Sequence, residues 1–207
     1  MRLKNVKGAK EYVDNSNYVI HNYKDYKGKY KEVFNNDNDI EIEIGTGKGN
    51  FIIEKAKQNP NINYIGIEKY DSVLIRALEK MDEKITNLKF IKMDATSIEE
   101  VFDKEINKIY LNFSDPWPKE RHSKRRLSSE FFLKKYDLIF KKENNIIMKT
   151  DNRKLFEYSI ISFTNYGYII DKISLDLHQD DIPNIQTEYE KKFSDLGQVI
   201  YMINVKK

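Results

Sequence analysis

The sequence predicts an α/β fold with a doubly wound, seven-stranded and mostly parallel sheet. Short apolar runs alternate with longer segments of helical period, and a glycine-rich turn follows the first apolar run. Of the 207 residues, 40% are hydrophobic, which is enough for one buried core. The predicted strands are 39–44, 63–68, 88–93, 106–113, 145–149, 168–174 and 199–205, and the predicted helices are 50–58, 71–83, 129–141 and 152–165.

In chain order, residues 1–36 precede the first predicted strand and form a basic N-terminal extension. Their periodicity is weak, so the extension either packs on the following domain, residues 37–207, or moves beside it. In the extension, lysines alternate with tyrosines in a way that suits RNA: Lys4, Lys7, Lys10, Lys24, Lys27, Lys29 and Lys31 among Tyr12, Tyr18, Tyr23, Tyr26 and Tyr30. In the domain that follows, one face of the predicted helix 71–83 is apolar.

The composition excludes several classes of chemistry. The chain has no cysteine, which excludes disulfides, thiolate zinc sites and a cysteine nucleophile. The net charge of +3 says little about partners. The start lacks an apolar signal core, and the longest apolar run, residues 199–203, is far below a membrane span. We therefore expect a cytoplasmic protein without a membrane segment, and since the histidines lack partners at ligand spacing, no metal.

Three acidic residues and a glycine loop follow the ends of successive predicted strands. Asn50 excludes the nicotinamide fingerprint, and the Walker pattern is absent as well. Glu68 ends the second strand about 20 residues past the loop, where it can accept hydrogen bonds from ribose hydroxyls. Asp94 closes the third strand; it either reaches an adenine amino group or caps the next turn. The loop has the E-x-G-x-G-x-G spacing of Rossmann-like methyltransferases: Glu43-Ile44-Gly45-Thr46-Gly47-Lys48-Gly49.

A stiff, basic loop follows the fourth predicted strand. Two prolines flank the only tryptophan, Trp117, and we expect them to hold Asp115 beside the bound methyl donor. Five Lys or Arg residues stand against one Glu in residues 119–126. Such a run is either a solvated face or, beside a rigid loop at the ligand end of a sheet, a phosphate-binding surface.

The chain resembles the bacterial tRNA (guanine-N(7)-)-methyltransferase family of TrmB-like proteins. The resemblance runs from Arg2 through the C-terminal strand, and the glycine loop is its least specific part. Its other motifs are Asn112-Phe113-Ser114-Asp115-Pro116-Trp117-Pro118-Lys119 with His122 and Arg125-Arg126-Leu127, then Lys149-Thr150-Asp151, and Thr187-Glu188-Tyr189-Glu190. The Asp-Pro-Trp-Pro-Lys loop and the late Thr-x-Tyr-Glu are the specific ones.

The resemblance implies a class I S-adenosylmethionine methyltransferase domain at residues 37–207 that methylates N(7) of a tRNA guanine, at position 46 of the variable loop. Asp115 is then the catalytic residue, and the protein is either a monomer or a homodimer. The implied cofactor residues are Glu43, Gly45, Gly47, Gly49, Glu68, Asp94 and Asp115. The implied substrate and RNA contacts are Lys119, Arg121, His122, Ser123, Lys124, Arg125, Arg126, Asp151, Thr187, Glu188, Tyr189 and Glu190.

This chemistry suits the residues present. N(7) of guanine carries a free lone pair and no proton, so alignment and electrostatics matter more than a general base. Asp115 either stabilises the developing positive charge or, like Asp151, holds the base. Two alternatives remain open: a methyltransferase for an exocyclic amine or a protein nitrogen, and a non-catalytic RNA-binding protein with a vestigial cofactor fold. The missing cysteine argues against pyrimidine C5 methylation through a thiolate adduct.

Overall fold

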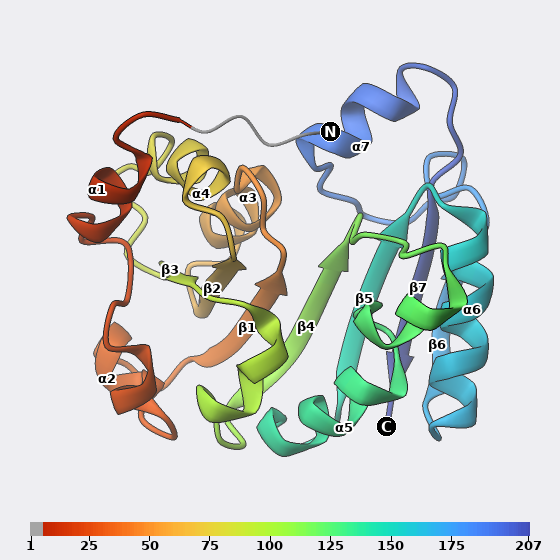
Figure 1. Cartoon of the computed structure of the whole chain (residues 1–207), viewed down its shortest axis with the longest axis horizontal. Coiled ribbons are helices and arrows are strands. Elements are labelled where there is room, and N and C mark those ends of the chain that lie inside the picture. Colours follow the sequence, from red (N-terminus) through yellow and green to blue (C-terminus); the bar gives the residue numbers. More distant parts are fainter. Residues whose placement is uncertain (1–5) are drawn as a thin grey trace.

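Seven strands form one sheet in the order β3-β2-β1-β4-β5-β7-β6 in the computed structural model, which describes residues 6–207 (Figure 1). β7 runs antiparallel to both of its neighbours, whereas the other pairings are parallel. The predicted doubly wound, mostly parallel sheet is confirmed. The strands are β1 (Asp39–Ile44), β2 (Ile62–Glu68), β3 (Leu88–Lys92), β4 (Ile106–Asn112), β5 (Asn145–Thr150), β6 (Ile169–Ser174) and β7 (Tyr201–Lys206).

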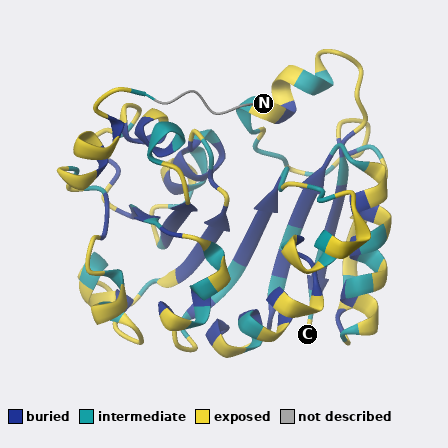
Figure 2. Cartoon of the chain, in the orientation of Figure 1, coloured by how far each residue is buried: buried dark blue, intermediate teal, exposed yellow. Residues whose placement is uncertain are grey.

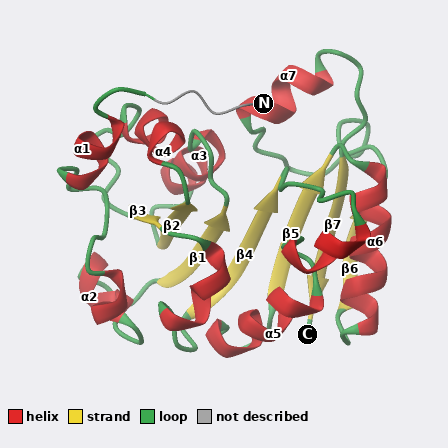
Figure 3. Cartoon of the chain, viewed as in Figure 1, coloured by secondary structure: helices red, strands yellow, loops and turns green. Residues whose placement is uncertain are grey.

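Helices cover both faces of the sheet, and its strands form the buried centre of the molecule (Figures 2 and 3). Because side chains alternate along a strand, β2 sends Ile65 and Ile67 into one core and Tyr64 into another. The first core joins the sheet to η2 (Ala95–Glu100), α5 (Glu130–Ile139) and α6 (Arg153–Asn165). The second joins it to α1 (Ala9–Asp14), α3 (Asn50–Gln58) and α4 (Asp71–Leu78).

Within residues 37–207, α4 is shorter than predicted and α7 (Glu188–Ser194) is not among the predicted helices. α4 ends at Leu78, because the next residues tighten into a turn in which Lys80 and Met81 donate to carbonyls three residues back. The additional helix, α7, begins with a capping box in which Thr187 and Glu190 bond each other's backbone N–H groups. None of the helices within residues 6–207 is long and apolar enough to cross a membrane.

The described part of the extension, residues 6–36, packs against the domain. The backbone N–H of Ile20 donates to the carbonyl of Phe90 (2.8 Å) and that of Phe90 donates to Tyr18 (2.8 Å), so the extension lines the outer edge of β3. Tyr30 is fully buried. Besides α1, the extension contains η1 (Tyr23–Tyr26) and α2 (Tyr30–Phe34), while Arg2 and Lys4 lie outside the described residues.

Candidate active site

A cleft of about 1080 Å³ opens at the carboxyl ends of β1 to β4. It lies where the strand order reverses between β1 and β4, the usual ligand site of a doubly wound sheet. Its volume suits a nucleoside-sized ligand. Of the seven predicted cofactor residues, four line the cleft: Gly45, Glu68, Asp94 and Asp115.

The glycine loop turns the chain sharply from β1 into α3. Gly45, Gly47 and Gly49 have φ values of 78°, 60° and 79°, a left-handed backbone that favours glycine. At Gly49 a side chain is also excluded by space, because a Cβ there would lie 2.6 Å from the Cβ of Ala77 on α4. Gly47 and Gly49 therefore shape the loop, while Gly45 reaches the cleft.

Glu43 lies behind the cleft wall and is 2% exposed. Its carboxylate accepts hydrogen bonds from the hydroxyl of Thr46 (2.6 Å) and the side-chain amide of Asn112 (2.7 Å). Burial raises the pKa of Glu43 to about 7, although both hydrogen bonds and the charge of Lys149 oppose the shift. The carboxylate of Glu43 therefore does not line the cleft itself but is hydrogen-bonded to Asn112, which does.

Asn112, at the end of β4, was not predicted as a site residue. Its Nδ2 donates to Glu43, while its Oδ1 is buried and has no hydrogen-bond partner within residues 6–207. A buried acceptor without a partner is unfavourable, so this atom, in a residue that lines the cleft, suits a ligand N–H or ammonium group. The sequence feature that could have identified Asn112 is its position as a polar residue at the end of an apolar strand.

Glu68 and Asp94 form another part of the cleft wall. The Oε1 of Glu68 accepts from the backbone N–H groups of Lys69 (2.8 Å) and Tyr70 (3.0 Å), and its Oε2 accepts from Gly47 (3.0 Å). Since a carboxylate oxygen accepts about two hydrogen bonds, Oε2 can take one more, from a ligand hydroxyl. Burial raises the pKa of Glu68, although the three N–H groups oppose this.

Of the two alternatives considered for Asp94, the structure shows the cap, and the contact with an adenine amino group stays a prediction. Its Oδ1 accepts from the backbone N–H of Thr96 (2.9 Å) and so caps η2, while its Oδ2 pairs with Lys69 (2.6 Å). The hydrogen bond from Lys69 lowers the pKa of Asp94. Asp94 therefore meets the cleft as a carboxylate already held in place. No cluster of three or more potential metal ligands occurs among residues 6–207.

The loop between β4 and η3 (Glu120–Arg125) carries Asp115. Phe113 and Trp117 adopt left-handed backbone conformations with φ of 51° and 41°, which cost about 1–3 kcal/mol each in a residue with a side chain. Asp115 lies between them, exposed, without a hydrogen bond to any residue in the described range 6–207. The loop is therefore a strained turn that presents a free carboxylate at the cleft.

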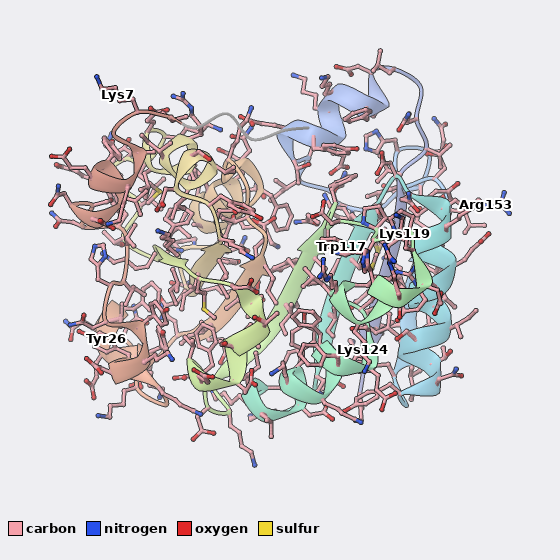
Figure 4. All side chains as sticks on the ribbon, viewed as in Figure 1. Lys7, Tyr26, Trp117, Lys119, Lys124 and Arg153 are labelled. Carbon is pink, nitrogen blue, oxygen red and sulfur yellow. The ribbon has the colours of Figure 1, made fainter. Side chains whose placement is uncertain are left out.

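Arg126 differs from the rest of the predicted RNA-binding run. It is 8% exposed, and its guanidinium donates to the carbonyls of Pro116 (3.1 Å) and Trp117 (3.0 Å). By contrast, the Arg125 guanidinium lies 4.8 Å above the Trp117 ring at the cleft. The exposed cations of the run are Lys119, Arg121, Lys124 and Arg125, with His122 and Ser123 half-buried, and Figure 4 labels three residues of this region, Trp117, Lys119 and Lys124.

A buried ion pair joins α7 to β5. Lys149, with a 4% exposed side chain, contacts the fully buried carboxylate of Glu190 at 2.6 Å and also donates to Asn184 Oδ1 and the carbonyl of Ile185. Burial alone would raise the pKa of Glu190, but Lys149 keeps it below its usual value. Glu190 therefore anchors α7, and its contact with guanosine stays a prediction. Sequence reasoning named Lys149 within the Lys149-Thr150-Asp151 motif but assigned it no role, although a lysine in the apolar run of β5 was a signal.

The other predicted residues at α7 lie around the same end of the sheet (Figure 1). Glu188 forms ion pairs with Lys48 and Lys80, so α7 is also tied to the glycine loop. The Tyr189 ring lies 5.1 Å from that of Phe113, and its hydroxyl donates to Asp151 Oδ2 (3.1 Å). The structure therefore brings Asp151 and Tyr189 next to the loop that carries Asp115.

Comparison with known proteins finds relatives along the whole chain. Residues 37–203 match the family Methyltransf_4, described as "Putative methyltransferase". A "tRNA (guanine-N(7)-)-methyltransferase" of Lachnoclostridium phytofermentans is 51% identical over 207 residues, which cover 98% of this chain and 97% of that protein. A protein of the same name from Bacillus subtilis is 51% identical over 209 residues, with coverage of 99% and 98%.

Solved structures share the fold. One described as "Structure of an antibiotic related Methyltransferase" matches with a TM-score of 0.67 and 20% identity, over 87% of this chain and 92% of that chain. At this identity the likeness concerns the fold alone. It confirms the predicted Rossmann-like fold.

Proposed function

The chain belongs to the tRNA (guanine-N(7)-)-methyltransferase family, and from this premise we propose that it methylates N(7) of a guanine in tRNA with S-adenosylmethionine as the donor. The observation that carries the proposal is the free carboxylate of Asp115, held in a strained loop between the donor cleft and exposed cations. By the family resemblance the guanine is at position 46 of the variable loop, and the enzyme works in the cytoplasm.

Three polar groups of the cleft are proposed to hold the donor. Asn112 Oδ1, backed by Glu43, accepts a hydrogen bond from the ammonium of the methionine portion. The free acceptor position of Glu68 receives a ribose hydroxyl, and Asp94 accepts from the adenine amino group. S-adenosylmethionine supplies a sulfonium methyl group, whose carbon an aligned nucleophile attacks in line with the departing thioether sulfur. The residues present fit this ligand, since its ammonium, ribose hydroxyl and adenine amino groups each meet a hydrogen-bond acceptor.

The chain's contribution to the chemistry is placement and charge. The N(7) lone pair forms the new N–C bond as the C–S bond breaks, so the purine becomes cationic and no proton needs to leave. We assign Asp115 to stabilising that charge, because its carboxylate is free, whereas Asp151 already accepts from Tyr189. Asp151 and Tyr189 are proposed to hold the base.

The tRNA backbone is proposed to lie along the exposed cations of residues 119–125, two of which, Lys124 and Arg125, also line the cleft. The extension offers fewer unpaired cations than its composition suggests, because several of its lysines already contact acidic or carbonyl groups of the chain. Ion pairs link Lys10 to Asp14, Lys24 to Glu100, and Lys31 to Asp37, and Lys27 donates to the Glu99 carbonyl.

A strand-cleavage assay tests the proposed reaction. N(7) methylation leaves the imidazole ring of guanine cationic and open to reduction, after which aniline cuts the strand. We expect unmodified tRNA to gain one cleavage site, at a variable-loop guanine, only after incubation with enzyme and donor. Labelled methyl entering tRNA without a new cleavage site contradicts N(7), and a site elsewhere contradicts position 46.

Donor affinity is expected to depend on pH through Glu43. Because burial raises its pKa to about 7, the carboxylate is largely protonated below that value and cannot attract the donor's ammonium group. Calorimetry should show the dissociation constant rising by about tenfold per pH unit below pH 7 and levelling off above it. The same shift makes the ligand-free protein less stable as the pH rises from 4.5 to about 7, since the folded state then binds more protons than the unfolded state.

Two variants separate the effect of Glu43 on this pH dependence from that of Glu68. Glu43→Gln should bind the donor more weakly than wild type at pH 8 and show little change between pH 6 and pH 8. Glu68→Gln should keep the pH dependence, although burial also raises the pKa of Glu68. A pH dependence that survives in Glu43→Gln would assign the titration to another group.

A further inference from the structure

We propose that Arg126 is a positioning residue that holds the Asp115 loop, residues 113–118, in its active conformation. The inference rests on the proposed function, because it concerns the residue assigned to charge stabilisation. Arg126 acts through the loop and touches neither the donor cleft nor an exposed surface for RNA: it is 8% exposed and is not among the residues that line the cleft.

The contacts of Arg126 join the loop to the rest of the domain. Nε donates to the carbonyl of Pro116 (3.1 Å) and Nη2 to that of Trp117 (3.0 Å), so one planar guanidinium holds two successive peptide groups. The guanidinium also lies 4.2 Å from the centre of the Tyr158 ring, on α6. Since α6 begins directly after Asp151 and Asn152, Arg126 ties the loop that carries Asp115 to the helix that follows Asp151.

The loop needs such a contact because it is strained and short of its own donors. Phe113 and Trp117, on either side of Asp115, both have left-handed backbones. Pro116 and Pro118 have no N–H group, so the loop contributes few hydrogen-bond donors of its own. Arg126 supplies two donors from outside. A lysine at this position keeps the charge but cannot make the same forked contact.

Arg126→Lys provides the test, because Trp117 is the only tryptophan of the chain and lies in the loop. We expect acrylamide to quench Trp117 fluorescence more strongly in the variant, as the loop loosens. We also expect kcat to fall by about 100-fold, the loss typical of a misplacement of about 1 Å, while the KM for tRNA changes little. Arg153→Lys, at an exposed arginine on α6, is the matched control and should leave quenching and kcat unchanged.

Chemical rescue covers the case in which lysine disturbs folding. In Arg126→Ala, added guanidinium at concentrations far below denaturing ones should restore wild-type quenching and part of kcat, whereas methylammonium should not. Wild-type quenching in a folded Arg126→Lys protein would overturn the proposal. So would a raised KM for tRNA with a smaller salt dependence, which would make Arg126 a phosphate contact. Fluorescence quenching is measured without tRNA, so it tests the role of Arg126 independently of whether the protein methylates tRNA.

Discussion

Asp115→Asn is expected to lower the single-turnover rate of tRNA methylation by about 10²- to 10³-fold, the range seen when one preorganised electrostatic group is removed. The amide keeps the size and some of the hydrogen bonds of the carboxylate, but it cannot offset the positive charge that develops on the purine. Binding of donor and tRNA should change much less than the rate. Labelled methyl transfer and aniline cleavage of the same samples measure the effect.

The variant is expected to fold normally, because Asp115 is exposed and forms no hydrogen bond to any residue in the described range. Glu120→Gln removes an exposed negative charge from the next turn, η3, and serves as the matched control. It should stay within about twofold of the wild-type rate, as expected for a solvated charge. An Asp115→Asn enzyme of full activity would mean that Asp115 only positions the base or plays no part. Asp151 would then be the candidate for stabilising the positive charge.

The fold was largely predictable because hydrophobic runs mark buried parallel strands. All seven strands lie within two residues of their predicted bounds. The helices of the extension were missed because α1 and α2 contain only 6 and 5 residues, too few to show a helical period. They exist because Val13 and Tyr30 are buried against the sheet, and sequence pattern does not report such tertiary contacts.

The acids at the strand ends were predictable for a topological reason, since parallel strands bring their carboxyl ends to one edge. Glu68, Asp94 and Asp115 all line the cleft. What escaped prediction depends on contacts between distant residues: Asn112 and Glu43 are 69 positions apart, and Lys149 and Glu190 are 41 apart. For Arg126, its charge predicted a phosphate contact. Its burial and its hydrogen bonds to the carbonyls of Pro116 and Trp117 became visible only in the structure.

Lys149→Met should lower the free energy of unfolding by about 3–5 kcal/mol, because it leaves the carboxylate of Glu190 buried without its cation. Lys206→Met is the matched control: its pair with Asp171, also at the sheet, is 35% and 43% exposed and should contribute less than about 1 kcal/mol. Urea unfolding of both variants, with Glu190→Gln and the double variant completing a cycle, measures the coupling.

The pH dependence of this loss identifies its cause. In the wild type, Lys149 keeps the pKa of Glu190 below its usual value, so the pair stabilises the fold at neutral pH and the contribution is lost in acid. Without Lys149, burial raises the pKa of Glu190 and only the hydrogen bonds from His178 and Asn184 still oppose that rise, so we expect the variant to lose stability as the pH rises. The stability gap between wild type and Lys149→Met should therefore be widest near neutral pH and shrink toward pH 4. A gap independent of pH would attribute the loss to packing, and a loss no larger than that of Lys206→Met would mean that the pair does not hold α7 on the sheet.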